Sequence, residues 1–340
     1  MVHFEYSHLI LTHLLFCEET LDLVFAIRKF RSSRLNIDIQ EERLAALLEK
    51  INQYVRSKTF NFRNLVNLYY DLSFLNRFRG DVVNELVTEI RNDGKVLTAF
   101  SVIQLLQALS RNSNALGHKE YTLIDQIIRN LNNMMNEFDT DQKAHIFKLI
   151  ASLNLQFRPP RYRLPYLLYI LRPQLKESFD TCSEKGVLYI VQAYKYLPKE
   201  YPSDLLNEIK EMVLLTTQHS SSNIKSYFLL EFFLSISELK KSRRFPEEKW
   251  KVLLDEIAQR ITHDDFMGRY TNMQKILEIL YDLKIHHEPI LQAVVTKINK
   301  SSEVALYGTL YELLVLQRVD VSPMLDKVYF LCLYYFQHGY

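Results

Sequence analysis

The sequence predicts an all-α protein, an α-solenoid of about seven to eight helical hairpins with a period of about 40 residues. Three observations favour this fold: apolar residues recur with the period of a helix, the same pattern returns along the chain, and glycine is scarce. The chain has 7 Gly and 9 Pro among 340 residues. Because β-proteins and dinucleotide-binding folds need glycine for turns and phosphate loops, both classes are disfavoured.

The clearest hairpin lies between residues 97 and 135. The apolar face of its first helix, helix A, consists of Ala99, Val102, Ile103, Leu106 and Leu109, and the opposite face of Thr98, Ser101, Gln104 and Gln107. After a polar stretch over 111–118, a second apolar stripe predicts helix B and comprises Ile124, Ile127, Ile128, Leu131, Met134 and Met135. This spacing is typical of two amphipathic helices joined by a short loop.

The same pattern recurs along the chain at intervals that average about 41 residues. Helix A is expected over 62–75, 97–109, 142–155, 184–196, 225–239, 273–283 and 303–316. Prolines precede the helix B segments, because proline is favoured in the first turn of a helix. These prolines are Pro165, Pro202, Pro246, Pro289 and Pro323. Thr181 and Glu184 have the spacing of a capping box that opens one helix A.

Two parts of the chain are expected, an irregular N-terminal helical hairpin over 1–58 and the helical-repeat solenoid over 59–340. A hairpin cannot bury its apolar face alone, so neighbouring hairpins must stack. Irregular spacing leaves open a compact helical domain without repeats. Trp250, in a helix B, is expected to be a packing residue.

The hairpin at residues 97–135 carries a resemblance to a known group of proteins. Ile-Gln-Leu-Leu-Gln-Ala-Leu-Ser at 103–110 is followed by a loop and by Leu-Ile-Asp-Gln-Ile-Ile at 123–128. This arrangement resembles the organellar helical repeats of the FAST-kinase-like, heptatricopeptide and octotricopeptide group, over roughly residues 60–320. The resemblance implies RNA metabolism in mitochondria or plastids, often within ribonucleoprotein assemblies or ribosomes. Many members end in a small RAP domain, and no segment after residue 320 resembles one, so a nuclease-like role is not expected.

Four linkers are basic and free of acidic residues, and each follows a predicted helix A. Their candidate RNA-binding residues are Arg28, Lys29, Arg31, Arg34, Arg77, Arg79, Arg158, Arg161, Tyr162, Arg163, Lys240, Lys241, Arg243 and Arg244. In a solenoid all A-to-B turns lie on one edge, so these residues would form a basic ridge. Arginine suits phosphate and aromatic rings suit bases, which is the pattern of a protein that binds an RNA backbone. Since the net charge is only +2, the alternative is that these are charged turns that bind nothing.

The last helix is apolar all round and predicts a partner surface. Its candidate partner-binding residues are Tyr329, Phe330, Leu333, Tyr334 and Phe336. A solenoid normally ends in a helix with a polar outer face, so we expect another protein subunit to cover this end. The alternative is that the helix folds back onto the core of its own chain.

Catalytic and metal-binding motifs were sought and none is predicted. The sequence has no glycine-rich phosphate loop, no HExxH and no GxSxG. His286-His287 and His263-Asp264-Asp265 are interpreted as surface turn residues. No cofactor, metal or small-molecule substrate is expected, and no apolar run is long enough to span a membrane.

The sequence therefore predicts a non-enzymatic subunit of a mitochondrial ribonucleoprotein assembly, associated with the mitoribosome. Its expected partners are ribosomal or other organellar RNA and other protein subunits, and its expected location is the mitochondrial matrix. The alternative is a HEAT- or armadillo-like protein–protein scaffold without RNA contact, in mitochondria or in the cytoplasm. An enzyme remains possible only if the interpretation of the fold is wrong.

Overall fold

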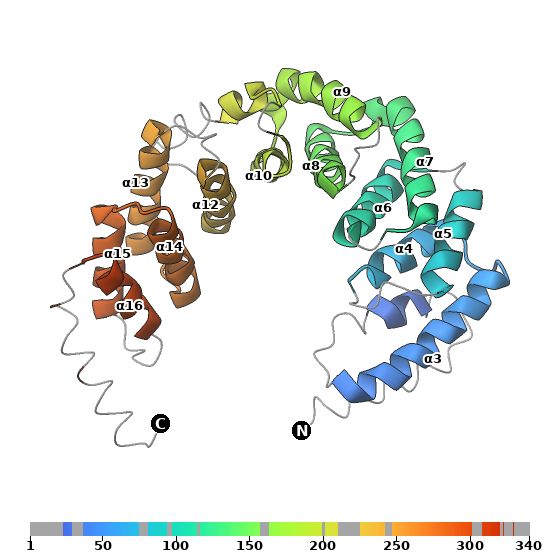
Figure 1. Cartoon of the computed structure of the whole chain (residues 1–340), viewed down its shortest axis with the longest axis horizontal. Helices are drawn as coiled ribbons and strands as arrows, with labels where there is room; N and C mark the ends of the chain where they lie inside the picture. The colour runs from blue at the N-terminus through green and yellow to red at the C-terminus, as the bar shows by residue number, and fades with distance from the viewer. Residues whose placement is uncertain are drawn as a thin grey trace. The chain divides into compact units, whose positions relative to one another are not determined.

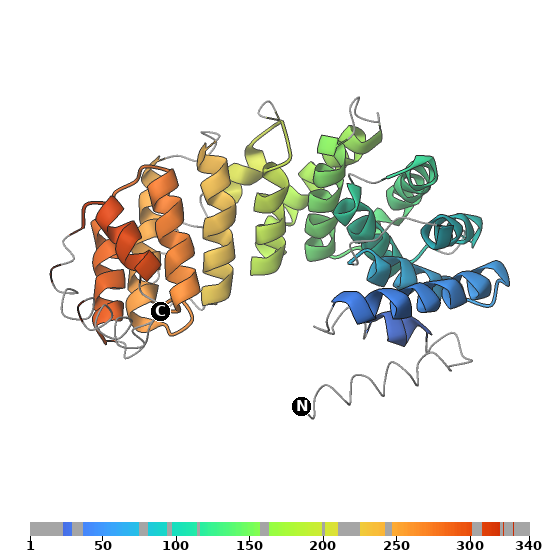
Figure 2. The same cartoon turned by 60° about the horizontal axis from the view of Figure 1, so that its bottom comes forward.

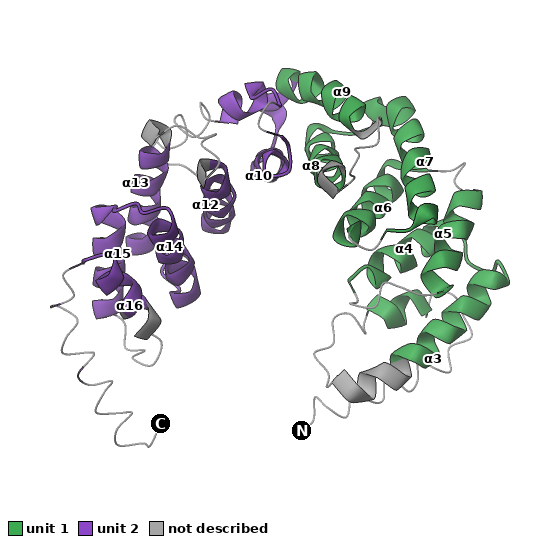
Figure 3. Cartoon of the chain, viewed as in Figure 1, with its two compact units in different colours: residues 1–177 green, residues 178–340 purple. Residues whose placement is uncertain are grey.

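The structure is a computed structural model in which every regular element of the described residues is a helix. The described residues are 23–28, 37–74, 81–93, 97–113, 116–156, 163–198, 201–209, 225–241, 247–300, 308–319, 322 and 329. The chain divides into two compact units, residues 1–177 and residues 178–340 (Figure 3). The all-α prediction is confirmed, with helices that pack in sequence as hairpins.

Unit 1 contains two interleaved rows of helices, seen in Figure 1 from α3 to α9. Its elements are α3 (Ile37–Arg56), α4 (Phe62–Leu72), α5 (Asp81–Asp93), α6 (Ala99–Arg111), α7 (His118–Met134), the 3₁₀ turn η3 (Met135–Glu137), α8 (Thr140–Gln156) and α9 (Arg163–Glu177). Within this unit α4 packs on α6 and α6 on α8, while α3 packs on α5, α5 on α7 and α7 on α9. We call α4, α6 and α8 the A row, and the others the B row.

Unit 2 repeats this alternation. Its elements are the 3₁₀ turn η4 (Phe179–Thr181), α10 (Glu184–Tyr194), a short helix over 204–209, α12 (Ser226–Lys241), α13 (Glu247–His263), α14 (Tyr270–Asp282), α15 (Glu288–Lys300) and α16 (Gly308–Leu316). The A row is α10, α12, α14 and α16, in which each helix packs on the next; in the B row, α13 packs on α15. Figure 2 shows α12, α14 and α16 as neighbours within this unit.

Every predicted helix A corresponds to an observed helix, with ends that differ by a few residues. Pro165 lies in the first turn of α9 and Pro289 is the second residue of α15, where a proline costs no hydrogen bond. The predicted capping box of Thr181 and Glu184 is wrong, because Glu184 is the first residue of α10 and Gly186 is the third. Ser183, not Thr181, caps α10, because the Ser183 hydroxyl accepts from Gly186 N, whereas the Thr181 hydroxyl donates to Ser178 O within η4.

The cores are filled by the apolar stripes that the sequence predicts. In α6, Val102, Leu106 and Leu109 have no exposed surface. In unit 2, Trp250 of α13 is 1% exposed and stacks on Phe233 of α12, with ring centroids 5.2 Å apart. Trp250 is therefore a packing residue between neighbouring helices, as expected.

The expected domain boundary at residue 58 stays a prediction. It falls within unit 1, and α3 on one side of it packs against α5 on the other. Among the helices that the structure describes, none combines the length and the apolar character that a bilayer crossing requires.

Candidate nucleic-acid interface

The A-to-B turns, at the carboxyl ends of the A-row helices, are the surface on which RNA binding was predicted. Most of the predicted residues lie outside the described part of the chain: Lys29, Arg31, Arg34, Arg77, Arg79, Arg158, Arg161, Tyr162, Arg243 and Arg244. Two helix boundaries differ from the prediction of linkers. Arg163 is the first residue of α9, and Lys240 and Lys241 end α12.

Arg28 is the predicted RNA-binding residue whose side chain the structure describes. Its Nε donates to Oδ2 of Asp71 at 3.2 Å. Asp71 belongs to α4 and has no exposed surface, while half of the Arg28 side chain is exposed. A buried carboxylate needs such a partner, since an unpaired buried charge is costly. Arg28 thus has a structural role at the start of unit 1 in addition to any role toward a ligand.

In unit 1, the guanidinium of Arg111, at the end of α6, packs on two aromatic rings at the end of α4. Its guanidinium lies 3.5 Å from the ring centroid of Phe74 and 4.9 Å from that of Tyr70. The two rings meet edge to face at 5.2 Å. Arg111 also donates from Nη1 to the hydroxyl of Ser73 at 3.3 Å. We call Tyr70, Phe74 and Arg111 the arginine–aromatic cluster.

This cluster presents both chemical groups that single-stranded RNA requires. Arg111 is exposed and has no ion pair with an acidic residue of the described chain. Phe74 is 40% exposed. A guanidinium stacked on a ring keeps its N–H edges available to phosphate, and a partly exposed ring can stack on a base.

In unit 2, Lys284 and Arg318 hold equivalent positions after α14 and α16. Both have a positive φ, 53° and 59°, and the only other described non-glycine residue with this conformation is Lys58, at 56°. We call these three residues the left-handed basic caps. Each directly follows the C-cap of its helix, where glycine is usual because a Cβ disfavours this backbone conformation.

The left-handed basic caps close their helices with the same pair of hydrogen bonds. At α14, Lys284 N donates to Tyr281 O at 3.0 Å and Ile285 N donates to Leu280 O at 2.9 Å. At α16, Arg318 N donates to Val315 O at 2.9 Å. The backbone alone satisfies the helix end, so the long charged side chains are not needed for it and extend into solvent.

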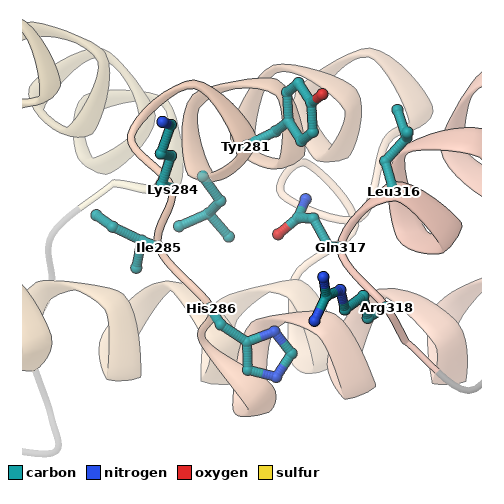
Figure 4. A pocket seen from close by; sticks show the side chains of 8 residues that line it. Tyr281, Lys284, Ile285, His286, Leu316, Gln317 and Arg318 are labelled. Atoms are coloured by element: carbon teal, nitrogen blue, oxygen red, sulfur yellow. The ribbon is translucent and has the colours of Figure 1, made fainter.

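The turns after α14 and α16 border a hollow of about 490 Å³, drawn in Figure 4. Its walls are formed by Leu280, Tyr281, Lys284, Ile285, His286, Leu316, Gln317 and Arg318. Figure 4 shows Lys284 and Ile285 on one side, and Leu316, Gln317 and Arg318 facing them. None of these lining residues is acidic, and two of them, Lys284 and Arg318, are cations.

Several other basic residues of the described helices are paired with acids. Arg56 of α3 lies 3.8 Å from Glu85, Arg260 of α13 lies 3.1 Å from Glu256, and Lys297 of α15 lies 3.4 Å from Asp265. In the A row, Lys195 after α10 pairs with Glu238 of α12 at 2.9 Å. At the carboxyl ends of the described A-row helices, Lys195 is thus paired, whereas Arg111, Lys284 and Arg318 have no acidic partner among the described residues.

Sequence reasoning missed these three cations because each stands alone rather than in a basic run. The available signal was positional. Each lies one or two residues after the end of a predicted helix A.

Of the predicted partner-binding residues, Tyr329 is described and is 66% exposed. Phe330, Leu333, Tyr334 and Phe336 lie outside the described residues. Whether another subunit covers this end stays a prediction.

The interpretation of His287 as a surface turn residue is wrong. His287 is 7% exposed and precedes α15. Its Nδ1 accepts from Ile290 N at 3.3 Å, and its Nε2 therefore carries the proton and donates to Asp255 Oδ1 of α13 at 3.0 Å. Burial lowers the pKa of His287, and the charges of Lys251 and His286 act in the same direction against the effect of Asp255. His287 is a helix cap that joins two B-row helices, not a metal ligand.

Within the ranges that the structure describes, no three His, Cys, Asp or Glu side chains are placed to share a metal ion. The second histidine–acid group is structural, since Asp264 accepts from Ser226 of α12 and from Phe266 N and Met267 N at the start of the next turn.

No protein-family model matches the sequence, and no curated protein matches it either. The likeness to organellar helical-repeat proteins therefore stays a prediction from the residue pattern.

Proposed function

We propose that the chain is a non-catalytic α-solenoid with a period of about 40 residues that binds the backbone of single-stranded RNA along its A-to-B turns. The observation that carries this proposal is the presence of exposed cations without acidic partners, Arg111, Lys284 and Arg318, beside exposed aromatic rings at these turns. Phosphate attracts such cations, and bases stack on such rings.

The hydrogen bonds between successive A-row helices support the period. In unit 1, Gln104 bonds Asn67, Gln107 bonds His145, and Ser110 bonds Ser152, over separations of 37, 38 and 42 residues. In unit 2, Gln317 donates to Leu277 O over 40 residues. Equivalent residues one repeat apart would meet in this way in a stack of hairpins.

The setting of this function is an organellar ribonucleoprotein assembly, and we propose the mitochondrial matrix and the mitoribosome as its place. This part of the proposal rests on the resemblance of the helix A and helix B phrases alone. The basic segments predicted to bind RNA at 77–79 and 158–163 follow α4 and α8 in the sequence.

A protein–protein scaffold is the second candidate, and one feature of the B row favours it. Tyr166 and Tyr169 of α9 are 57% and 64% exposed. Tyr166 borders a hollow of about 440 Å³ between α7 and α9, together with Ile128, Arg129, Asn132 and Leu167. Exposed tyrosines beside an arginine are common in protein interfaces.

Fluorescence anisotropy with a labelled single-stranded RNA, measured at several salt concentrations, tests the proposal. Arg111→Gln should weaken binding severalfold and reduce the slope of log affinity against log salt by about 0.7, the value for one lost phosphate contact. Arg129→Gln, which removes the same charge from the B row, should leave both unchanged. No RNA binding by the wild type at low salt, or a larger effect of Arg129→Gln, would contradict the proposal and favour the scaffold.

A further inference from the structure

The hollow between the turns after α14 and α16 is the described site with the most complete set of groups for one ligand. It combines two cations of opposite walls, an aromatic ring and a buried amide. Its volume of about 490 Å³ lies within the range of about 300–1,000 Å³ that small-ligand sites occupy.

The cations of the hollow are available for an anion. Lys284 and Arg318 are exposed, and neither has an ion pair with an acidic residue in the described chain. His286 is different, because its Nε2 lies 3.0 Å from Glu288 Oε2 and is already paired with that carboxylate. Figure 4 shows Lys284 and Arg318 on opposite sides of the hollow, so both cations border the space that an anion would enter.

The third group is Gln317, which is 9% exposed and lies on the wall between the two cations. Its Nε2 donates to Leu277 O of α14 at 3.2 Å. Its Oε1 is buried and has no hydrogen-bond partner among the described residues. A buried amide oxygen without a donor is unfavourable, so a ligand that supplies an O–H or N–H group here would gain a hydrogen bond that the protein alone lacks.

The fourth group is Tyr281, whose ring is 46% exposed at the rim of the hollow. Leu316 is 56% exposed on the facing wall. A planar base could lie against these two side chains while the phosphate attached to it reaches the cations.

We propose that this hollow is a ribonucleotide subsite within the RNA-binding edge. It takes one nucleotide of a single strand, with the phosphate between Lys284 and Arg318, the base on Tyr281 and the ribose 2′-hydroxyl donating to Gln317 Oε1. The 2′-hydroxyl is the group that separates RNA from DNA. This inference rests on the proposed RNA binding and adds to it a preference for RNA and a location in unit 2.

The left-handed basic caps allow a matched test. Glycine is well accommodated at positive φ after a helix, so Lys284→Gly combined with Arg318→Gly removes both charges without straining the backbone. Lys58→Gly is the control, because Lys58 has the same conformation and charge after α3, a B-row helix of unit 1, and does not line the hollow. Full-length variants are titrated into labelled single-stranded RNA and DNA of one sequence.

We expect the double variant to bind RNA about ten-fold more weakly at low salt and with a salt slope smaller by about 0.7, because the one phosphate held between the two cations is lost. Lys58→Gly should bind like the wild type. Gln317→Met should lower the affinity for RNA to the affinity for DNA and leave DNA binding unchanged. Tyr281→Ala should weaken the binding of both RNA and DNA, and Tyr281→Phe should bind both as the wild type does.

Each contrary outcome has a distinct meaning. If the double variant binds RNA as tightly as the wild type does, the subsite is overturned and the proposed function stands. Equal affinity of the wild type for RNA and DNA would overturn the ribose contact. Adenosine monophosphate bound as tightly as the RNA would show a free-nucleotide site instead, and no RNA binding at all would overturn the proposed function and the subsite together.

Discussion

Replacing His287 with alanine should destabilise unit 2 by about 2 kcal/mol, and asparagine should restore about half of that loss. His287 makes two bonds that the variants separate. Its Nδ1 caps α15 through Ile290 N, and its Nε2 reaches Asp255 of α13. Loss of an N-cap side chain costs about 1 kcal/mol. Loss of the bond to Asp255 costs about 1 kcal/mol more, because Asp255 is 49% exposed and its charge is partly screened.

Asparagine separates the two contributions because it is a good N-cap residue but is too short to reach α13. His287→Asn should therefore cost about 1 kcal/mol, and His287→Ala about 2 kcal/mol. The difference between the variants isolates the cap.

Acid should remove the contribution of His287. Because burial lowers the pKa of His287 in the folded chain, the unfolded chain binds the proton more readily near and below its ordinary pKa of 6.5. Stability from this residue is therefore fully present above pH 6.5 and falls as the pH drops below it, by at most about 1.4 kcal/mol per pH unit. His287→Asn, which does not titrate, should lack this component.

The assay is urea unfolding followed by tryptophan fluorescence at pH 7.5 and pH 5.5. Trp250 is the only tryptophan, and it lies on α13, the helix that His287 joins to α15, so its signal reports on this part of unit 2. Equal stability of the alanine and asparagine variants, or the same pH dependence in His287→Asn as in the wild type, would refute the reasoning.

Three further predictions concern packing and helix ends. Trp250→Ala should cost about 3–5 kcal/mol because it empties the stack against Phe233; circular dichroism during urea unfolding measures this, and a loss below 1 kcal/mol would contradict it. A double-mutant cycle of Ser110→Ala and Ser152→Ala should give a coupling of about 0.5–1 kcal/mol between α6 and α8, and additive losses would argue against that contact. Glycine at each left-handed basic cap should leave stability unchanged or raise it by up to about 1 kcal/mol, whereas a clear loss would show that the side chains hold their helices.

Much of the fold could be predicted because each helix has its own apolar stripe. The periodicity at 97–135 located α6 and α7, and the recurrence located the remaining A-row helices. Periodicity does not say what the polar face of a helix meets. Gln104 and Gln107 were assigned to the outward face of α6, yet both are half-buried and bond side chains of α4 and α8. In two interleaved rows, an A-row helix has neighbours on both flanks, so part of its polar face is shared with them.

The candidate site was harder to predict for a related reason. Runs of basic residues are visible in a sequence, but the described cations at the A-to-B turns are single residues whose importance depends on which helix ends are adjacent. Arg111 reaches Phe74 from the next A-row helix, and Lys284 faces Arg318 across 34 residues of sequence. Nor could the left-handed conformation of Lys284 be read from its identity, because glycine is the usual residue there.

The burial of His287 also could not be predicted from the sequence. Two adjacent histidines in a polar turn suggest solvent exposure, and His286 is indeed exposed. The second ring turns inward because the first turn of α15 has N–H groups that need acceptors. Only the neighbouring helix α13 supplies the carboxylate that completes its bonding.

Mapping RNA crosslinks on the chain tests the central claim most directly. The full-length protein is irradiated with single-stranded RNA, and the crosslinked residues are identified by mass spectrometry. Binding along the A-to-B turns predicts crosslinks at Phe74 in unit 1 and Tyr281 in unit 2, the aromatic residues beside the unpaired cations. Crosslinks confined to Tyr166 and Tyr169 of the B row would contradict this claim. A crosslinking yield no higher than that of a protein without RNA affinity would contradict it as well.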